Sequence, residues 1–188
     1  NADAYASVRD LVDEAMMKFA DKPAFRSFGQ TLTYADVDRH SRALAAFLQT
    51  KLGVKKGDRI AVMTPNIFAF ALAMIANARI GAVQVNVNPL YTPRELEHQL
   101  NDAGVETIVI FSGSTATLAE IIGATKVKNV IVAGVGDGSG AKLPSPPADP
   151  RLSHQIALAD ALAEGATMTF TPPTLRGDDV LFLQYTGG

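Results

Sequence analysis

The chain has 188 residues, 47% hydrophobic and 19% charged, a balance typical of one globular domain and not of a disordered segment. Its 17 Lys and Arg nearly match its 19 Asp and Glu, so the net charge of −2 gives no reason to expect a nucleic-acid partner. Cysteine is absent, which excludes disulfides, cysteine-ligated metal centres and thiol catalysis. Together with the lack of a secretory signal at the first residues, this composition leads us to expect a cytoplasmic protein.

Capping residues and apolar periodicity predict two helices in the first fifty residues. Ser7 opens the first, which ends before Pro23, and Thr33 opens the second. Between them, residues 24–34 alternate aromatic and polar side chains around Gly29-Gln30. That pattern is typical of a β-hairpin.

From residue 60 onward, short apolar strands alternate with helices. Strands are expected at residues 60–63, 83–87, 107–111 and 129–132, and helices at 67–80, 93–103 and 114–122. This order predicts βαβ crossovers and therefore an α/β fold, with a mainly parallel sheet covered by helices on both faces and an N-terminal β-hairpin added to it. The ten most apolar residues, 67–76, are too few to span a bilayer as a helix.

Glycine and proline interrupt this pattern between residues 134 and 152, and we interpret that segment as a flexible linker within the domain. Its run from Gly134 to Gly140 resembles a dinucleotide-binding fingerprint. However, Ser139 stands where a glycine is required, and no helix follows. A short helix at 153–163 and a last strand at 180–185 complete the expected elements.

The most informative feature is the end of that last strand, which runs directly into Tyr185-Thr186-Gly187-Gly188. Glycine lets backbone N–H groups approach an anion closely, and many phosphate-binding loops begin with a buried strand followed by such a turn. On composition alone an ordinary turn is the better interpretation, because two glycines carry little information. The isolated histidines and the pair Asp178-Asp179 have no catalytic or metal-ligand spacing, so we assign no catalytic and no metal-binding residue.

Two stretches resemble bacterial long-chain fatty-acid–CoA ligases, which are acyl-CoA synthetases of the adenylate-forming superfamily. Residues 85–102 (VNVNPLYTPRELEHQLND) are similar to a segment characteristic of that branch, and residues 183–188 (LQYTGG) are similar to the start of the superfamily's ATP phosphate loop. Weaker agreement runs through residues 22–25, 32–34 and 56–66. The resemblance implies that residues 1–188 are part of the large N-terminal, AMP-binding domain of such a ligase, about its first third.

The resemblance also implies an activity. A long-chain fatty acid would be activated by ATP to an acyl-adenylate, and CoA would then displace AMP to give acyl-CoA. ATP, CoA and Mg²⁺ would take part, and the triphosphate loop would begin with Tyr185, Thr186, Gly187 and Gly188. In the family the rest of the loop, the nucleotide contacts, the Mg²⁺ ligands and the adenylation lysine all follow this point, so the 188 residues by themselves are expected to be inactive.

Several alternatives stay open. One is a ligase for a shorter-chain or aromatic acid, and another is a non-catalytic α/β module that binds a lipid or a protein through residues 67–80. The family's counterpart of residues 134–154 is longer, with apolar and basic character. The short Gly/Pro-rich version here argues against membrane docking through this segment. Peripheral association with the inner membrane by another route and the oligomeric state stay open.

Overall fold

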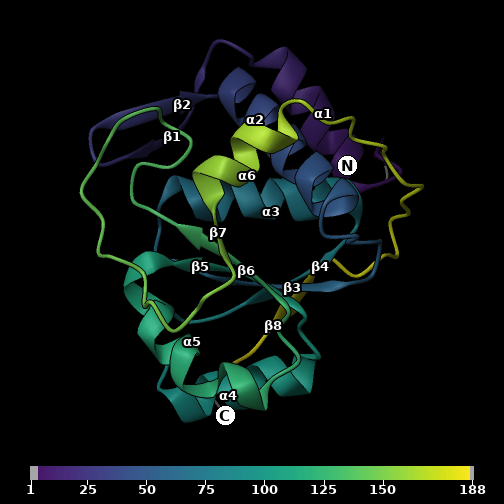
Figure 1. Ribbon diagram of the computed structural model, residues 1–188. Coiled ribbons are helices and arrows are strands. Elements are labelled where there is room, and N and C mark those ends of the chain that lie inside the picture. The colour runs from purple at the N-terminus through teal and green to yellow at the C-terminus, as the bar shows by residue number, and fades with distance from the viewer. Residues whose placement is uncertain (1–3, 187–188) are drawn as a thin grey trace.

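The computed structural model describes residues 4–186, and its centre is a six-stranded sheet with helices on both faces (Figure 1). The strands are β3 (Arg59–Met63), β4 (Val83–Asn86), β5 (Thr107–Phe111), β6 (Asn129–Ala133), β7 (Gln155–Ala157) and β8 (Phe182–Gln184). They lie in the order β7-β6-β5-β3-β4-β8, and each neighbouring pair is parallel. The prediction of an α/β fold with a mainly parallel sheet is confirmed.

The helices form one layer on each side of the sheet (Figure 1). One layer contains α1 (Val8–Lys18), α2 (Tyr34–Thr50), α3 (Phe68–Ile80) and α6 (Leu158–Gly165), and the other contains α4 (Pro93–Ala103) and α5 (Thr115–Ile121). Strand β3 contributes side chains to the cores on both faces of the sheet. Ile60 and Val62 pack in the core beneath the first helix layer, and Ala61 and Met63 pack in the core beneath α4 and α5. Because successive strand residues point to opposite faces, a strand buried on both sides is apolar throughout.

Two helices begin at the residues that the sequence indicates. The hydroxyls of Thr33 and Thr92 accept the backbone N–H groups of Asp36 and Glu95, whose carboxylates accept the two threonine N–H groups in return. The hydrogen bonds that Thr92 donates hold the pKa of Glu95 below its usual value. These caps satisfy N–H groups that have no partner within the helix.

The hairpin of β1 (Pro23–Ser27) and β2 (Gln30–Thr33) is antiparallel as predicted, but its turn lies one residue earlier than expected. Ser27 pairs with Gln30, so the turn residues are Phe28 and Gly29. Both have positive φ, +48° and +73°, as a two-residue type I′ turn requires. A phenylalanine rarely adopts this conformation, so the sequence did not indicate it.

The prediction of a helix over residues 153–163 is partly wrong. Residues 155–157 form the edge strand β7, and helix α6 begins only at Leu158. This strand has only three residues, with the half-buried Ile156 between two exposed neighbours, and is therefore too short to show a periodic apolar pattern in the sequence. The strand forms because the free edge of β6 offers backbone groups that need partners.

Residues 134–152 contain no helix or strand, as expected for a linker, but they contact the body of the domain. The Asp149 N–H donates to the Thr115 hydroxyl at 2.9 Å, and Leu152 is buried in the core beneath α4 and α5. The flexibility of this segment stays a prediction.

Helix α3 is the centre of the first helix layer, and eleven of its thirteen residues are buried. This burial contradicts the alternative in which residues 67–80 present a surface to a lipid or protein. Within residues 4–186, no helix has the length and apolar character needed to cross a membrane.

The side chain of Arg79 on α3 is completely buried and joins three helices. Its guanidinium donates to the Ser41 hydroxyl of α2 at 3.0 Å and to the carboxylates of Asp13 on α1 and Asp38 on α2. Burial lowers the pKa of Arg79, and the nearby Arg42 charge lowers it further, while the two carboxylates oppose this shift. A buried cation that keeps its charge needs partners of this kind.

We expect Arg79→Ala to lower the free energy of unfolding by about 3 kcal/mol, because it opens a cavity and removes the hydrogen bond to the buried Ser41 hydroxyl, while Arg42 stays paired with both carboxylates. Arg39→Ala is the matched control, since Arg39 pairs with Asp36 at the surface and such pairs contribute less than about 1 kcal/mol. Urea unfolding followed by circular dichroism measures both. Equal losses in the two variants would contradict the role assigned to Arg79.

Candidate functional site

The carboxyl ends of the parallel strands meet at one edge of the sheet. In open α/β sheets, ligands bind outside this edge, near the point where the strand order reverses. Here the reversal lies between β3 and β5, because the chain passes from β3 to β4 in one direction and from β5 to β6 in the other. We take this edge as the candidate site.

Three buried polar atoms near this edge have no hydrogen-bond partner among the described residues. Thr64 Oγ1 directly follows β3, and Ser112 Oγ directly follows β5. Gln99 Oε1 lies on α4 below the end of β4, where Gln99 Nε2 donates to the Asn86 carbonyl at 2.8 Å. Each residue is at most 6% exposed. An unsatisfied buried polar group costs about 1–3 kcal/mol, so a water molecule or ligand group that binds at this edge would be stabilised by these atoms.

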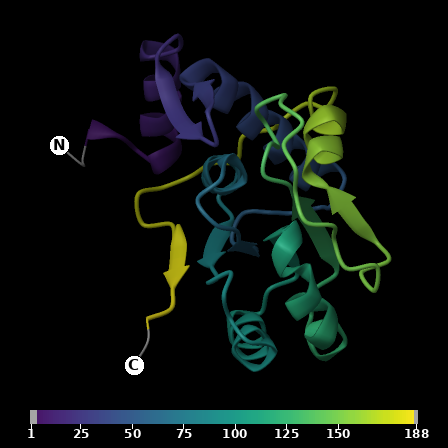
Figure 2. The same cartoon turned by 90° about the vertical axis from the view of Figure 1, so that its left-hand side faces the viewer.

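Two of the four predicted site residues, Tyr185 and Thr186, lie at this edge because they follow the last strand. Strand β8 pairs with β4 and lies at the border of the molecule, drawn in yellow in Figure 2. Tyr185 and Thr186 continue beyond its carboxyl end, with Tyr185 half-buried and Thr186 exposed. Gly187 and Gly188 lie outside the described residues.

The side chain of Tyr185 is anchored on the α4 side of the sheet. Its phenol donates to the carboxylate of Asp102, in the last turn of α4, at 2.5 Å. Burial, followed by this hydrogen bond, raises the pKa of Tyr185 to about 12, and the positive charge of Arg59 opposes the shift. The phenol therefore stays protonated near neutral pH and acts as a hydrogen-bond donor that fixes the residue.

The other titratable residues singled out in the sequence do not join this site. His98 and His154 are exposed, and Asp178 and Asp179 pair with Arg176 and Lys56 at the surface. Among residues 4–186, no three acidic or histidine side chains come together to hold a metal ion. The described part of the chain therefore does not fit a Mg²⁺ site.

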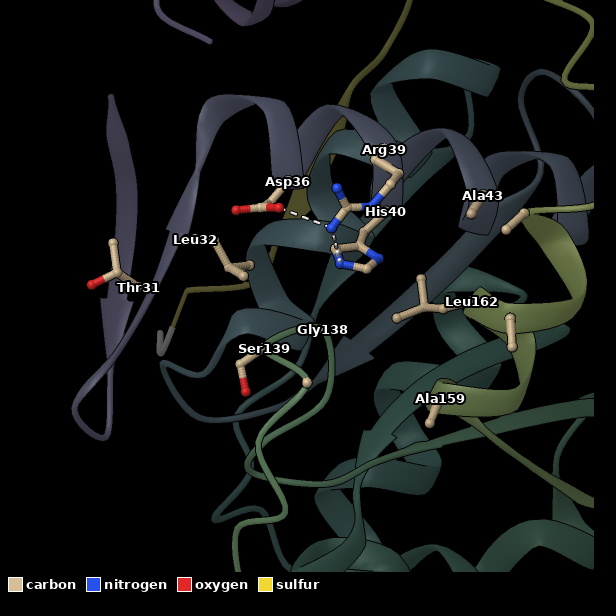
Figure 3. Close-up of a pocket in the computed structure, with 13 residues that line it drawn as sticks. Thr31, Leu32, Asp36, Arg39, His40, Ala43, Gly138, Ser139, Ala159 and Leu162 are labelled. Atoms are coloured by element: carbon tan, nitrogen blue, oxygen red, sulfur yellow. Dashed lines mark hydrogen bonds and ion pairs between the residues drawn. The ribbon is translucent and has the colours of Figure 1, made fainter. Parts of the chain in front are cut away.

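Apart from this edge, a pocket of 450 Å³ lies between α2, α6 and the turn at residues 138–140 (Figure 3). Its apolar wall includes Leu32 and Leu162. Its charged groups satisfy one another, because Arg39 donates to Asp36 at 2.8 Å and lies 3.3 Å from the His40 ring nitrogen. Burial lowers the pKa of His40, and the Arg39 charge lowers it further. Since these charges are paired, we assign this pocket no ligand.

Sequence reasoning missed the residues that hold the end of β8, above all Asn86 and Asp102. Both lie inside the segment 85–102 that carries the family resemblance, so their neighbourhood was identified although their partners were not. The alternation of Gln84, Val85 and Asn86 was the available signal, because it indicates one amide face and one apolar face on a single strand.

Ultraviolet titration tests the anchoring of Tyr185. The difference at 295 nm between the wild type and Tyr185→Phe should report one tyrosine that ionises near pH 12 and not near its ordinary 10. Asp102→Asn should bring this pKa down, and burial alone should still keep it above 10. Because the folded state holds this proton more tightly than the unfolded state, its contribution to stability is complete below pH 10 and is lost as the pH rises through 12. Ionisation of Tyr185 near pH 10 would contradict the contact with Asp102.

Comparison with known proteins agrees with this geometry. The AMP-binding enzyme family matches residues 12–188. A long-chain-fatty-acid–CoA ligase of Escherichia coli is 42% identical over an alignment that covers 100% of this chain and 36% of the relative. A 4-coumarate–CoA ligase of Humulus lupulus is 30% identical, with 93% of this chain and 30% of the relative covered.

The fold comparison leads to the same family. The crystal structure of a long-chain-fatty-acid-CoA ligase from Archaeoglobus fulgidus superposes with a TM-score of 0.74 at 26% identity, covering 97% of this chain and 35% of that one. The chain thus spans 30% to 36% of the length of these relatives. It belongs to the AMP-binding enzyme family.

Proposed function

We propose that the full-length protein to which these residues belong is a long-chain fatty-acid–CoA ligase that uses ATP. The fatty-acid carboxylate oxygen attacks the α-phosphorus of ATP, and the bond to the leaving pyrophosphate breaks. The CoA thiol, losing its proton, then attacks the acyl carbon and releases AMP. The substrates are therefore a fatty acid, ATP and CoA.

The observation that carries this proposal is the position of Tyr185-Thr186 at the carboxyl edge of the sheet, the same edge at which the buried hydroxyls of Thr64 and Ser112 follow β3 and β5. A chain that leaves this edge through two glycines can direct backbone N–H groups toward phosphate oxygens. Such donors stabilise the charge that develops when two anions react. The 42% identity to the Escherichia coli ligase over the whole chain supports the same reaction.

The contribution of this chain is limited to binding and orientation. Tyr185 fixes the start of the loop through Asp102, and the amides from Thr186 onward would face the phosphates. Mg²⁺ would screen phosphate charge when bound, and residues 4–186 do not bring together side chains that could hold it. Cytoplasmic location and association with the inner membrane stay predictions.

A second candidate is a ligase for an aromatic acid, favoured by the 30% identity to the 4-coumarate–CoA ligase. The nucleotide chemistry is the same in both cases, so the acid must be identified by experiment.

Pyrophosphate release from the full-length protein, with ATP, CoA and a graded series of acids, tests the proposal. We expect the highest kcat/KM with acids of about 12 to 18 carbons, because each buried methylene contributes about 0.8 kcal/mol to binding. Highest activity with 4-coumarate would favour the aromatic-acid ligase. No release with any acid would contradict both ligase assignments.

A second test is Gly187→Val in the full-length protein. Its branched side chain would keep phosphate oxygens away from the loop amides, so acid-dependent ATP–pyrophosphate exchange should fall at least a hundredfold while the thermal midpoint stays close to that of the wild type. Unchanged exchange would remove the assignment of the phosphate loop.

A further inference from the structure

Four amide side chains form a continuous row of hydrogen bonds from α3 to the end of β8. Asn77 Nδ2 donates to Gln84 Oε1 at 3.0 Å, and Gln84 Nε2 donates to Asn86 Oδ1 at 2.8 Å. Asn86 Nδ2 donates to Gln184 Oε1 at 2.8 Å, and Gln184 Nε2 donates to the Tyr185 carbonyl at 3.3 Å. We call Asn77, Gln84, Asn86 and Gln184 the amide relay.

The direction of the amide relay is fixed by its last acceptor. The Tyr185 carbonyl can only accept, so Gln184 must present its NH₂ group there and its oxygen to Asn86. Each earlier amide is then oriented in turn, donating toward β8. The end farthest from the loop is Asn77 Oδ1, which is buried and has no donor among the described residues. One carbonyl at the start of the loop thus sets the orientation of all four side chains.

The amide relay is not explained by packing alone. Asn77 and Gln84 are 1% and 0% exposed, and apolar residues in their places would fill the same volume without the cost of burying amides. Aligned hydrogen bonds strengthen one another and favour a single geometry, most of all at the buried end of the row, between Asn77 and Gln84. We therefore infer that these buried amides serve to hold β8 in one position, and that this offsets the free-energy cost of burying them.

Strand β8 needs contacts that fix its position, because it is only three residues long and lies at one edge of the described sheet. Phe182 remains 37% exposed, so apolar packing alone holds it weakly. The amide relay contacts β8 through Gln184 on one face, and Asp102 holds Tyr185 on the opposite face. The two contacts together clamp the last residues before the glycines.

We propose that Asn86 and Gln184 are positioning residues for nucleotide binding. By fixing the Tyr185 carbonyl, they set the direction in which the chain leaves β8 and so the place where the loop amides meet the phosphates. This inference rests on the proposed function, because it requires that the residues after Tyr185 bind phosphate. An error in this direction should weaken ATP binding and leave the binding of acid and CoA unchanged.

The test uses Asn86→Asp in the full-length protein. The aspartate keeps the volume and the acceptor for Gln84 but cannot donate to Gln184, whose NH₂ group then turns toward the carboxylate and leaves the Tyr185 carbonyl. We expect the KM for ATP in acid-dependent ATP–pyrophosphate exchange to rise about tenfold, since one hydrogen bond near a charged group is lost. The KM for acid in the same exchange, and the KM for CoA in the overall ligase reaction, should stay within about twofold.

Asn129→Asp is the matched control. Asn129 Nδ2 also donates across a pair of parallel strands, to Thr107 Oγ1 at 3.0 Å, but at the amino ends of β6 and β5 and far from the loop along each strand. This variant should keep the wild-type KM for ATP. If the two aspartate variants behave alike, the positioning role is overturned.

A second pair of variants guards against a failure of Asn86→Asp to fold. Gln184→Leu lies at an exposed position and removes the last donor, so it should raise the KM for ATP by the same factor. Asn86→Leu combined with Gln184→Leu should raise it no further than either alone, because both interrupt one row. Additive effects, or no effect of Gln184→Leu, would overturn the inference. A wild-type protein without acid-dependent exchange would instead overturn the proposed function.

Discussion

The pairing of β8 with β4 is the interaction on which the candidate site depends. Strand β4 pairs with β3 on one side and with β8 on the other, and in the second pair Val85 lies opposite Leu183 and Asn86 opposite Gln184. The two strands are about a hundred residues apart in the chain, and β8 has no other strand partner among the described residues. Parallel register therefore determines that Tyr185 leaves the sheet at the edge where the other strands end.

This dependence gives a physical meaning to the segment that carries the family resemblance, residues 85–102. It holds the last strand, β8, in place. Asn86 holds Gln184 on one face of the sheet, and Asp102 holds Tyr185 on the other. Gln99 in turn donates to the Asn86 carbonyl and links helix α4 to the same strand. The segment that carries the family resemblance therefore positions the end of β8.

The sequence predicted most of the elements because their signals are local. Capping residues such as Thr33 and Thr92 and short apolar runs such as 107–111 identify helices and buried strands without knowledge of the topology. Strand β7 was missed because its formation depends on the free edge of β6. The prediction that Tyr185, Thr186, Gly187 and Gly188 begin a phosphate loop stays a prediction, and the sequence did not indicate the contacts of Asn86 and of Asp102 with β8, since these exist only after the sheet has formed. The buried Arg79 was missed for the same reason.

Hydrogen exchange of backbone amides in the full-length protein tests the central claim most directly. If nucleotide phosphates bind where the chain leaves β8, ATP should slow exchange in peptides that begin near Leu183 and contain the amides after Tyr185. CoA added without ATP should leave these peptides unchanged. Exchange that ATP slows elsewhere in the protein but not in these peptides would contradict the account.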